Sequence, residues 1–392
     1  MHRKNTLDRG LSKREFLQAG AGGICALCLW GLGGGNKGYG QPPPRWNVAG
    51  ASPGFVRPRP AQWFSRAGGT KLRCELCPWS CELAPGQKAR CRVRTNRGGT
   101  GYTLAYGNPV LVQEDPVERK PFFHVLPGSR ALSISTAGCN LECKFCEVWD
   151  MALADPQEVH AYDMPPKAVI EHAKAANLRS ISYAFGEPVV FYEYMYETAV
   201  LAKKQGLLNL MHTAGYIQPA PLKELSGLLD AVNVDFKSFD PAFYREMCGG
   251  ELQPVLRTLR QLKAAGVHLE ITNLLIPTLN DDLQKIRQMC TWIKQELGAQ
   301  VPIHFARFYP LYKLTNLPPT PVSTLDNARN TALEVGLKFV YVARVTGHTG
   351  ESTFCPDCGK VVIKRVGFVI DQMHLSGGQC THCGAALGGR WQ

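Results

Sequence analysis

The sequence has no apolar run that reaches the roughly 18 residues needed for a membrane-spanning helix, so no integral membrane span is expected. It also lacks a block of like charges. Of the formal net charge of +12, residues 1–40 carry +4 (six Lys/Arg less two Asp/Glu) and the remainder carries +8. This spread favours a solvated surface suited to anionic small molecules and argues against a nucleic-acid partner. The absence of a short-period repeat excludes a solenoid.

Cysteine, in contrast, is abundant. Eleven of the fifteen cysteines fall into three tight groups, and Cys25, Cys28, Cys248 and Cys290 are left over. The chain is far larger than the small proteins that disulfides hold together, so this grouping favours metal ligation over a disulfide framework.

The first 40 residues are predicted to be a leader. Lys13-Arg14-Glu15-Phe16-Leu17 precedes a weakly apolar stretch and resembles a twin-arginine export signal in which Lys13 replaces the first arginine. The alternative is a disordered cytoplasmic leader, so the localisation stays open between cytoplasm and export. Residues 41–60, rich in Gly and Pro, are predicted to be a linker.

The remainder is predicted to contain a Cys-rich metal module at 61–125, an α/β region at 126–348 and a zinc ribbon at 349–390. In the α/β region, strand patterns alternate with helix patterns, which favours parallel βαβ units and a partial (β/α)6 barrel. Active sites of such barrels gather where the strands end. The predicted strands are 130–136, 180–185, 208–213, 231–237, 267–276, 302–308 and a possible seventh at 338–343; the predicted helices are 166–177, 189–204, 222–229, 252–265, 282–297 and 324–335.

The central cysteine motif is Cys139-x3-Cys143-x2-Cys146, directly after the first predicted strand. Three thiolates can hold three irons of a [4Fe-4S] cluster, whereas electron-transfer clusters use four cysteines. The remaining iron can be chelated by the amino and carboxylate groups of S-adenosylmethionine, and one electron then generates a 5′-deoxyadenosyl radical. The alternatives are a structural zinc knuckle and an accidental triplet.

With this motif the sequence resembles the radical S-adenosylmethionine (radical SAM) superfamily. The resemblance implies that Phe145 packs near the adenine. It also implies that Gly186-Glu187, in place of a Gly-Gly-Glu-like segment, holds the methionine amino group; an ordinary turn is the alternative. Thr213-Ala214 stands where relatives commonly have Ser-Asn, so an asparagine that could contact the cofactor is missing.

Asp235 and Lys237 end the fourth predicted strand and point to the same side of it. They resemble the Asp-x-Lys motif of the glycyl-radical-enzyme activases, which implies that Lys237 meets the cofactor carboxylate; a surface ion pair is the alternative. The same resemblance implies that His304 touches cofactor or substrate, against the alternative of a core histidine.

Two further cysteine groups flank the α/β region. Cys74, Cys77, Cys81 and Cys91 lie in a loop-rich stretch and suit zinc or a second iron–sulfur cluster, with disulfides as the alternative. Cys355-x2-Cys358 and Cys380-x2-Cys383 are each followed by glycine and are predicted to form a closed zinc ribbon with a hairpin between them; a redox dithiol is the weaker alternative.

The ordered set of motifs over residues 70–385 resembles the radical enzyme of the AmmeMemoRadiSam system, which is similar to pyruvate formate-lyase activating enzymes. This resemblance implies hydrogen abstraction from a substrate, a reductant such as flavodoxin or ferredoxin, and protein partners of that system. Relatives have Cys-Gln-Asn-Trp where this chain has Cys146-Glu147-Val148-Trp149, so the resemblance does not identify the substrate. A small-molecule substrate, glycyl-radical activation of a partner protein and a non-catalytic metal-binding scaffold are the hypotheses carried forward.

Overall fold

The computed structural model describes residues 52–392. The predicted leader (1–40) lies outside the described residues. Residues 52–60, the end of the predicted linker, form two short strands that pair with later strands: β1 (Ser52–Pro53) with β10 (His160–Ala161), and β2 (Arg59–Pro60) with β7 (Thr100–Thr103). Within residues 52–392, no helix is long and apolar enough to cross a membrane.

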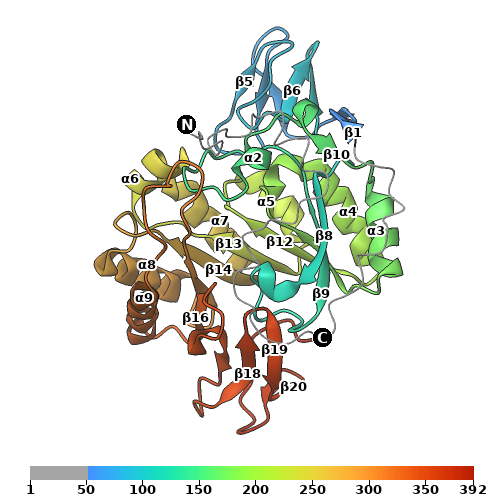
Figure 1. The fold of residues 1–392 in the computed structure, drawn as a ribbon. Helices are drawn as coiled ribbons and strands as arrows, with labels where there is room; N and C mark the ends of the chain where they lie inside the picture. The colour runs from blue at the N-terminus through green and yellow to red at the C-terminus, as the bar shows by residue number, and fades with distance from the viewer. Residues whose placement is uncertain (1–51) are drawn as a thin grey trace, which may run out of the picture. The chain divides into compact units, whose positions relative to one another are not determined.

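The centre of the fold is an eight-stranded sheet in the order β16-β15-β14-β13-β12-β11-β9-β8 (Figure 1). Seven strands run parallel, and β8 joins one edge antiparallel to β9. Parallel strands are covered on both faces, which is why their sequences are short apolar runs. The bounds are β8 Leu111–Pro116, β9 Arg130–Ser135, β11 Ser180–Tyr183, β12 Leu208–Thr213, β13 Ala231–Asp235, β14 His268–Leu275, β15 Ile303–Arg307 and β16 Val340–Ala343.

This arrangement confirms the predicted α/β class and the possible seventh strand. Among the described strands, no pairing joins β16 to β8, so the sheet stays open. Because the parallel strands share one direction, their carboxyl ends lie at a common edge. The cysteine motif lies in a loop that leaves this edge, and Asp235 ends β13 there.

Helices follow the strands and cover the sheet (Figure 1). In α7, the buried residues Val255, Leu256, Leu259 and Leu262 recur at helical spacing and form one apolar face. The bounds are α2 Trp149–Ala152, α3 Pro166–Ala175, α4 Tyr192–Lys204, α5 Pro219–Ser226, α6 Pro241–Phe243, α7 Leu252–Ala264, α8 Leu283–Glu296 and α9 Val322–Val335, with short turns η2 Val117–Arg119, η3 Pro156–Glu158, η4 Pro188–Phe191 and η6 Thr349–Glu351 and a π-helical turn η5 Tyr244–Cys248.

The Cys-rich residues before the sheet form small antiparallel sheets, β3-β4-β5 and β2-β7-β6, whose remaining strands are β3 Phe64–Arg66, β4 Leu72–Cys74, β5 Glu82–Leu83 and β6 Arg94–Arg97. A buried ion pair joins this part to the helix α4. Arg94 donates to the Glu193 carboxylate at 2.9 Å, and the two side chains are 1% and 5% exposed. Glu193 also accepts the Gln62 backbone N–H at 2.9 Å.

At the amino ends of the parallel strands, the Glu270 carboxylate accepts the backbone N–H groups of Phe123 and His124 at 3.0 and 2.9 Å. The C-terminal ribbon packs on the same region through Phe123, Phe339 and Tyr341. Its strands are β17 Thr353–Phe354, β18 Val361–Val366, β19 Val369–Met373, β20 Leu375–Ser376 and β21 Gln379–Cys380. The β18–β19 pair is the hairpin that the sequence predicted between the two Cys-x2-Cys motifs.

Replacing Glu193 with Gln is expected to destabilise the fold by about 3 kcal/mol, because the Arg94 charge stays buried without its counter-charge. Glu334→Gln serves as the control: Glu334 pairs with Arg287 on the surface, so its loss should cost less than about 1 kcal/mol. Denaturant unfolding of the metal-loaded chains measures both. Equal midpoints for Glu193→Gln and the wild type would contradict the assignment.

Candidate metal centre and cofactor site

The loop after β9 carries Cys139, Cys143 and Cys146, and two of its backbone N–H groups bond to η5. Glu142 N–H donates to the Cys248 carbonyl at 2.9 Å, and Lys144 N–H donates to the Met247 carbonyl at 2.8 Å. The Leu141 N–H points at the Cys139 sulfur, 3.4 Å away. Burial raises the pKa of the Cys139 and Cys146 thiols, and a bound metal would favour their thiolate forms.

The three sulfurs do not form a compact group with all ligand atoms within 4.8 Å of one another, as Cys355, Cys358, Cys380 and Cys383 do. A single zinc ion needs such compactness, whereas an iron–sulfur cluster binds each cysteine through a different iron. The triplet therefore fits a cluster better than a zinc knuckle.

Cys248 is a neighbour of this triplet that the sequence analysis left unassigned. It ends η5, and the influence of its thiol lowers the pKa of Cys143. The sequence held no signal for this contact, because Cys248 is an isolated cysteine far along the chain from the motif.

Asp235, at the end of β13, contacts His212 and Lys237 at the same edge. His212 Nε2 lies 2.8 Å from Asp235 Oδ1, and Lys237 Nζ donates to Oδ2 at 3.1 Å. Burial of the Asp235 carboxylate raises its pKa. The attraction of Lys237 and His212 outweighs this effect and holds the pKa of Asp235 below its ordinary value. Burial likewise opposes the charge of Lys237, yet Asp235, Cys143 and Cys248 raise the pKa of Lys237 above its ordinary value.

Lys237 is thus a cation beside the cysteine loop, with 11% of its side chain exposed. Its Nζ lies 5.6 Å from the centre of the Phe145 ring, and Phe145 is itself buried against Phe243. The predicted Asp-x-Lys pair is therefore an ion pair at the site rather than on the surface.

Glu187 lies in the loop that follows β11, and its carboxylate is buried. One oxygen accepts the Thr213 hydroxyl at 2.6 Å and the Val189 N–H at 3.1 Å, and the other accepts the Ala214 N–H at 2.8 Å. Burial raises the pKa of Glu187 despite these donors, so an additional positive group nearby would stabilise its ionised form. Gly186 precedes it, where a Cβ would lie 2.5 Å from the Ser135 hydroxyl.

His304 lies away from these groups. It is fully buried, its Nε2 is 2.7 Å from Glu270, and its ring stacks on Tyr341 at the amino ends of the strands. This setting favours the alternative of a core histidine over a contact with cofactor or substrate.

Comparison with known proteins agrees with the site. The family model of the radical SAM superfamily matches residues 133–290. The chain is also 40% identical over 331 residues to the protein MJ0808 of Methanocaldococcus jannaschii, a match that covers 84% of this chain and 98% of that protein. This chain belongs to the radical SAM superfamily. It is a radical SAM enzyme, and the hypothesis of a non-catalytic scaffold loses its support.

Among named relatives of this radical SAM enzyme is the pyruvate formate-lyase-activating enzyme of Clostridium pasteurianum, 28% identical over 223 residues, which cover 54% of this chain and 91% of that enzyme. A solved domain of a pyruvate formate-lyase-activating enzyme from Bacteroides vulgatus aligns with a TM-score of 0.38 at 16% identity, over 42% of this chain and 98% of that one. Membership of the superfamily implies a [4Fe-4S] cluster and S-adenosylmethionine.

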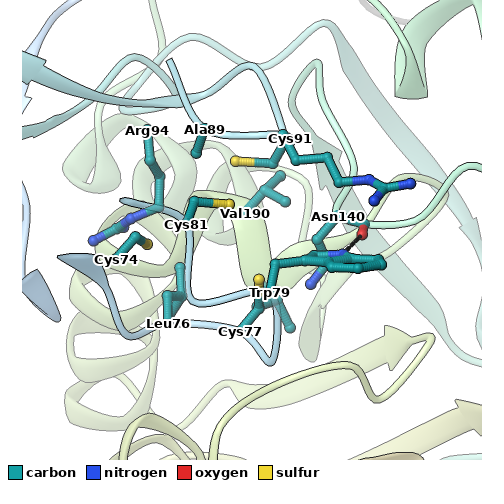
Figure 2. A pocket seen from close by; sticks show the side chains of 12 residues that line it. Cys74, Leu76, Cys77, Trp79, Cys81, Ala89, Cys91, Arg94, Asn140 and Val190 are labelled. Atoms are coloured by element: carbon teal, nitrogen blue, oxygen red, sulfur yellow. Dashed lines mark hydrogen bonds between the residues drawn. The ribbon is translucent and has the colours of Figure 1, made fainter. Parts of the chain in front are cut away.

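The radical SAM enzyme carries its two other cysteine groups in different geometries. In the C-terminal ribbon the Cys355 and Cys383 sulfurs are 3.6 Å apart, and those of Cys358 and Cys380 are 3.9 Å apart. In the N-terminal part, Cys74, Cys77, Cys81 and Cys91 line a pocket (Figure 2).

Cys248 is expected to tune a cluster and not to bind it, if the motif cysteines Cys139, Cys143 and Cys146 are the three protein ligands. Cys248→Ala should then keep the iron and sulfide content of the wild type, while the loss of the thiol that lowers the pKa of Cys143 lowers the reduction potential. Cys143→Ala should bind about four irons fewer per chain. Metal analysis and a potentiometric titration of the reconstituted proteins measure these effects. An equal loss of iron in both variants would make Cys248 a ligand.

Proposed function

We propose that this radical SAM enzyme abstracts hydrogen from a small-molecule substrate, with Cys139, Cys143 and Cys146 as the protein ligands of its cluster. The cluster, when reduced with S-adenosylmethionine bound, supplies a 5′-deoxyadenosyl radical. The observation that carries the proposal is the meeting of the three cysteines with the Asp235–Lys237 pair and Phe145 at the carboxyl edge of one parallel sheet.

Lys237 is suited to hold the carboxylate of the methionine part. Its ammonium group is charged, has three N–H donors, and gives one of them to Asp235. Asp235 and His212 hold Lys237 in place, since Asp235 shares its two oxygens between them. The ring of Phe145, next to Lys237, offers an apolar surface to the adenine.

Glu187 is suited to hold the amino group of the methionine part. Its two oxygens accept three donors in all, which fixes the carboxylate and leaves acceptor capacity for an ammonium group. Burial excludes water from this contact, so a charge-assisted hydrogen bond there would be strong. His304 has no part in this arrangement because it is enclosed at the other end of the strands.

The family resemblance to the AmmeMemoRadiSam system supports a small-molecule reaction with separately encoded partner proteins, and a flavodoxin or ferredoxin as reductant. Activation of a glycyl-radical enzyme is the second candidate, because named relatives are activating enzymes. Residues 147–165 contain no cysteine, so the ferredoxin-like insert common in that class after the cluster loop is missing, and this favours the first candidate.

The ribbon is proposed to bind one zinc ion through Cys355, Cys358, Cys380 and Cys383. Four thiolates that bind zinc at about 2.3 Å lie about 3.8 Å apart, and the two measured sulfur pairs are 3.6 and 3.9 Å apart. The site is closed by four protein ligands, so its role would be structural.

The central test is cleavage of S-adenosylmethionine. The anaerobically reconstituted chain, with dithionite and S-adenosylmethionine, is expected to form 5′-deoxyadenosine, and Cys143→Ala is expected to form none. A wild-type chain that holds its cluster and forms no 5′-deoxyadenosine would contradict the proposal.

Lys237→Met is expected to weaken binding of S-adenosylmethionine by about 30-fold, the equivalent of about 2 kcal/mol for a hydrogen bond to a charged group. Equilibrium dialysis on the oxidised protein measures this without turnover. Lys167→Met is the control, because Lys167 is 84% exposed on α3. Unchanged affinity in Lys237→Met would remove Lys237 from the binding site.

Zinc analysis tests the ribbon. The wild type is expected to contain about one zinc per chain at this site, and Cys358→Ser to lose it together with thermal stability. Cys290→Ser is the matched control, since Cys290 is buried in α8 and belongs to no cysteine group. Retention of zinc by Cys358→Ser would refute the assignment.

A further inference from the structure

Four cysteines before the central sheet converge on one pocket (Figure 2). They come from separate turns: Cys74 ends β4, Cys77 and Cys81 lie in the following loop, and Cys91 precedes β6. The rest of the lining is mostly apolar and includes Leu76, Trp79, Ala89, Val189 and Val190. Arg90, Arg94 and Asn140 complete the lining, so the four cysteines share one partly buried site.

The spacing of these sulfurs differs from that of the ribbon. Within residues 52–392, Cys355, Cys358, Cys380 and Cys383 are the only set of three or more Cys, His, Asp or Glu side chains with all ligand atoms within 4.8 Å of one another. No three of the N-terminal cysteines meet that limit, and a thiolate-bound zinc needs its sulfurs about 3.8 Å apart. The two four-cysteine sites therefore differ in the spacing of their sulfurs, and the wider N-terminal spacing favours a cluster over a single ion.

The N-terminal site instead matches the triplet Cys139, Cys143 and Cys146, whose sulfurs are also spread beyond that limit. Four irons bound to four separate cysteines require such a spread, because the inorganic core lies between the sulfurs.

The pocket also lies directly against the cluster loop. Trp79 Nε1 donates to the carbonyl of Asn140, the residue after Cys139, at 2.7 Å. A Cβ at Gly138, on the other side of Cys139, would lie 2.7 Å from the Cys91 carbonyl oxygen. Asn140 itself lines the pocket. The backbone of residues 138–140 thus lies between the two groups of cysteines and contacts both.

We propose that Cys74, Cys77, Cys81 and Cys91 bind a second [4Fe-4S] cluster, adjacent to the first. With a cysteine on each iron, this cluster has no position for a substrate or for S-adenosylmethionine. The metal assignment goes beyond the proposed function and does not depend on it, because it follows from the sulfur spacing and the pocket alone.

The test removes the first cluster from the full chain by the triple substitution Cys139→Ala, Cys143→Ala and Cys146→Ala. After anaerobic reconstitution with iron and sulfide, this variant is expected to hold about four irons and four sulfides per chain, and to give a reduced-cluster signal in electron paramagnetic resonance. Further substitution of Cys77 and Cys81 with Ser should abolish both. The proposal is overturned by a triple variant that holds no iron and a second zinc besides the one of the ribbon. It is also overturned if Cys74, Cys77, Cys81 and Cys91 resist thiol alkylation because they form disulfides.

A second measurement covers a triple variant that fails to fold. The reconstituted wild type is expected to contain about eight irons per chain, and only about four would overturn the proposal. The failures are distinguishable: four irons with 5′-deoxyadenosine formed refutes this inference alone, and eight irons without 5′-deoxyadenosine refutes the proposed function alone.

Discussion

The site depends on the fixation of one loop, residues 136–148, that has little regular structure of its own. The N-terminal part holds it through the Trp79–Asn140 hydrogen bond. The loop after β12 holds it through Asn140 Nδ2, which donates to the Tyr216 carbonyl at 2.7 Å, and η5 holds it through two backbone hydrogen bonds. Three separate parts of the chain therefore position the cysteines. Ordering an irregular loop costs conformational entropy for each residue. Without these anchors nothing would offset that cost, and the loop would not hold the cysteines in a fixed geometry.

Charge is the second constraint on this region. Thiolates at partly buried cysteines are stabilised by a positive neighbour, and Lys237 supplies it from the adjacent edge of the sheet. Lys237 would itself be costly to bury, and Asp235 compensates for it, while His212 adds a further partner. The Asp235–Lys237 ion pair is therefore part of the site. An Asp–Lys pair elsewhere on the surface would not place a positive charge beside the cysteines.

Much of this could be predicted from the sequence. The strands, the helices, the place of Cys139 after the first parallel strand and the ribbon hairpin follow from local patterns of apolar residues, Gly and Pro. Cys248, the enclosure of His304 by Glu270 and Tyr341, and the pairing of residues 52–60 could not. Each of these depends on contacts between distant parts of the chain, for which a single sequence holds no local signal.

The two four-cysteine groups show that the spacing of cysteines along the chain does not by itself predict how close their sulfurs lie. Both contain Cys-x2-Cys, but in the ribbon each pair is followed by a glycine with positive φ, Gly359 at +71° and Gly384 at +81°. Their N–H groups bond back to the first cysteine of each pair, which draws the sulfurs together. In the N-terminal group Pro78 follows Cys77 and has no N–H to give, so this closed turn cannot form. The residue after the second cysteine, rather than the spacing itself, thus distinguishes a compact site from an open one.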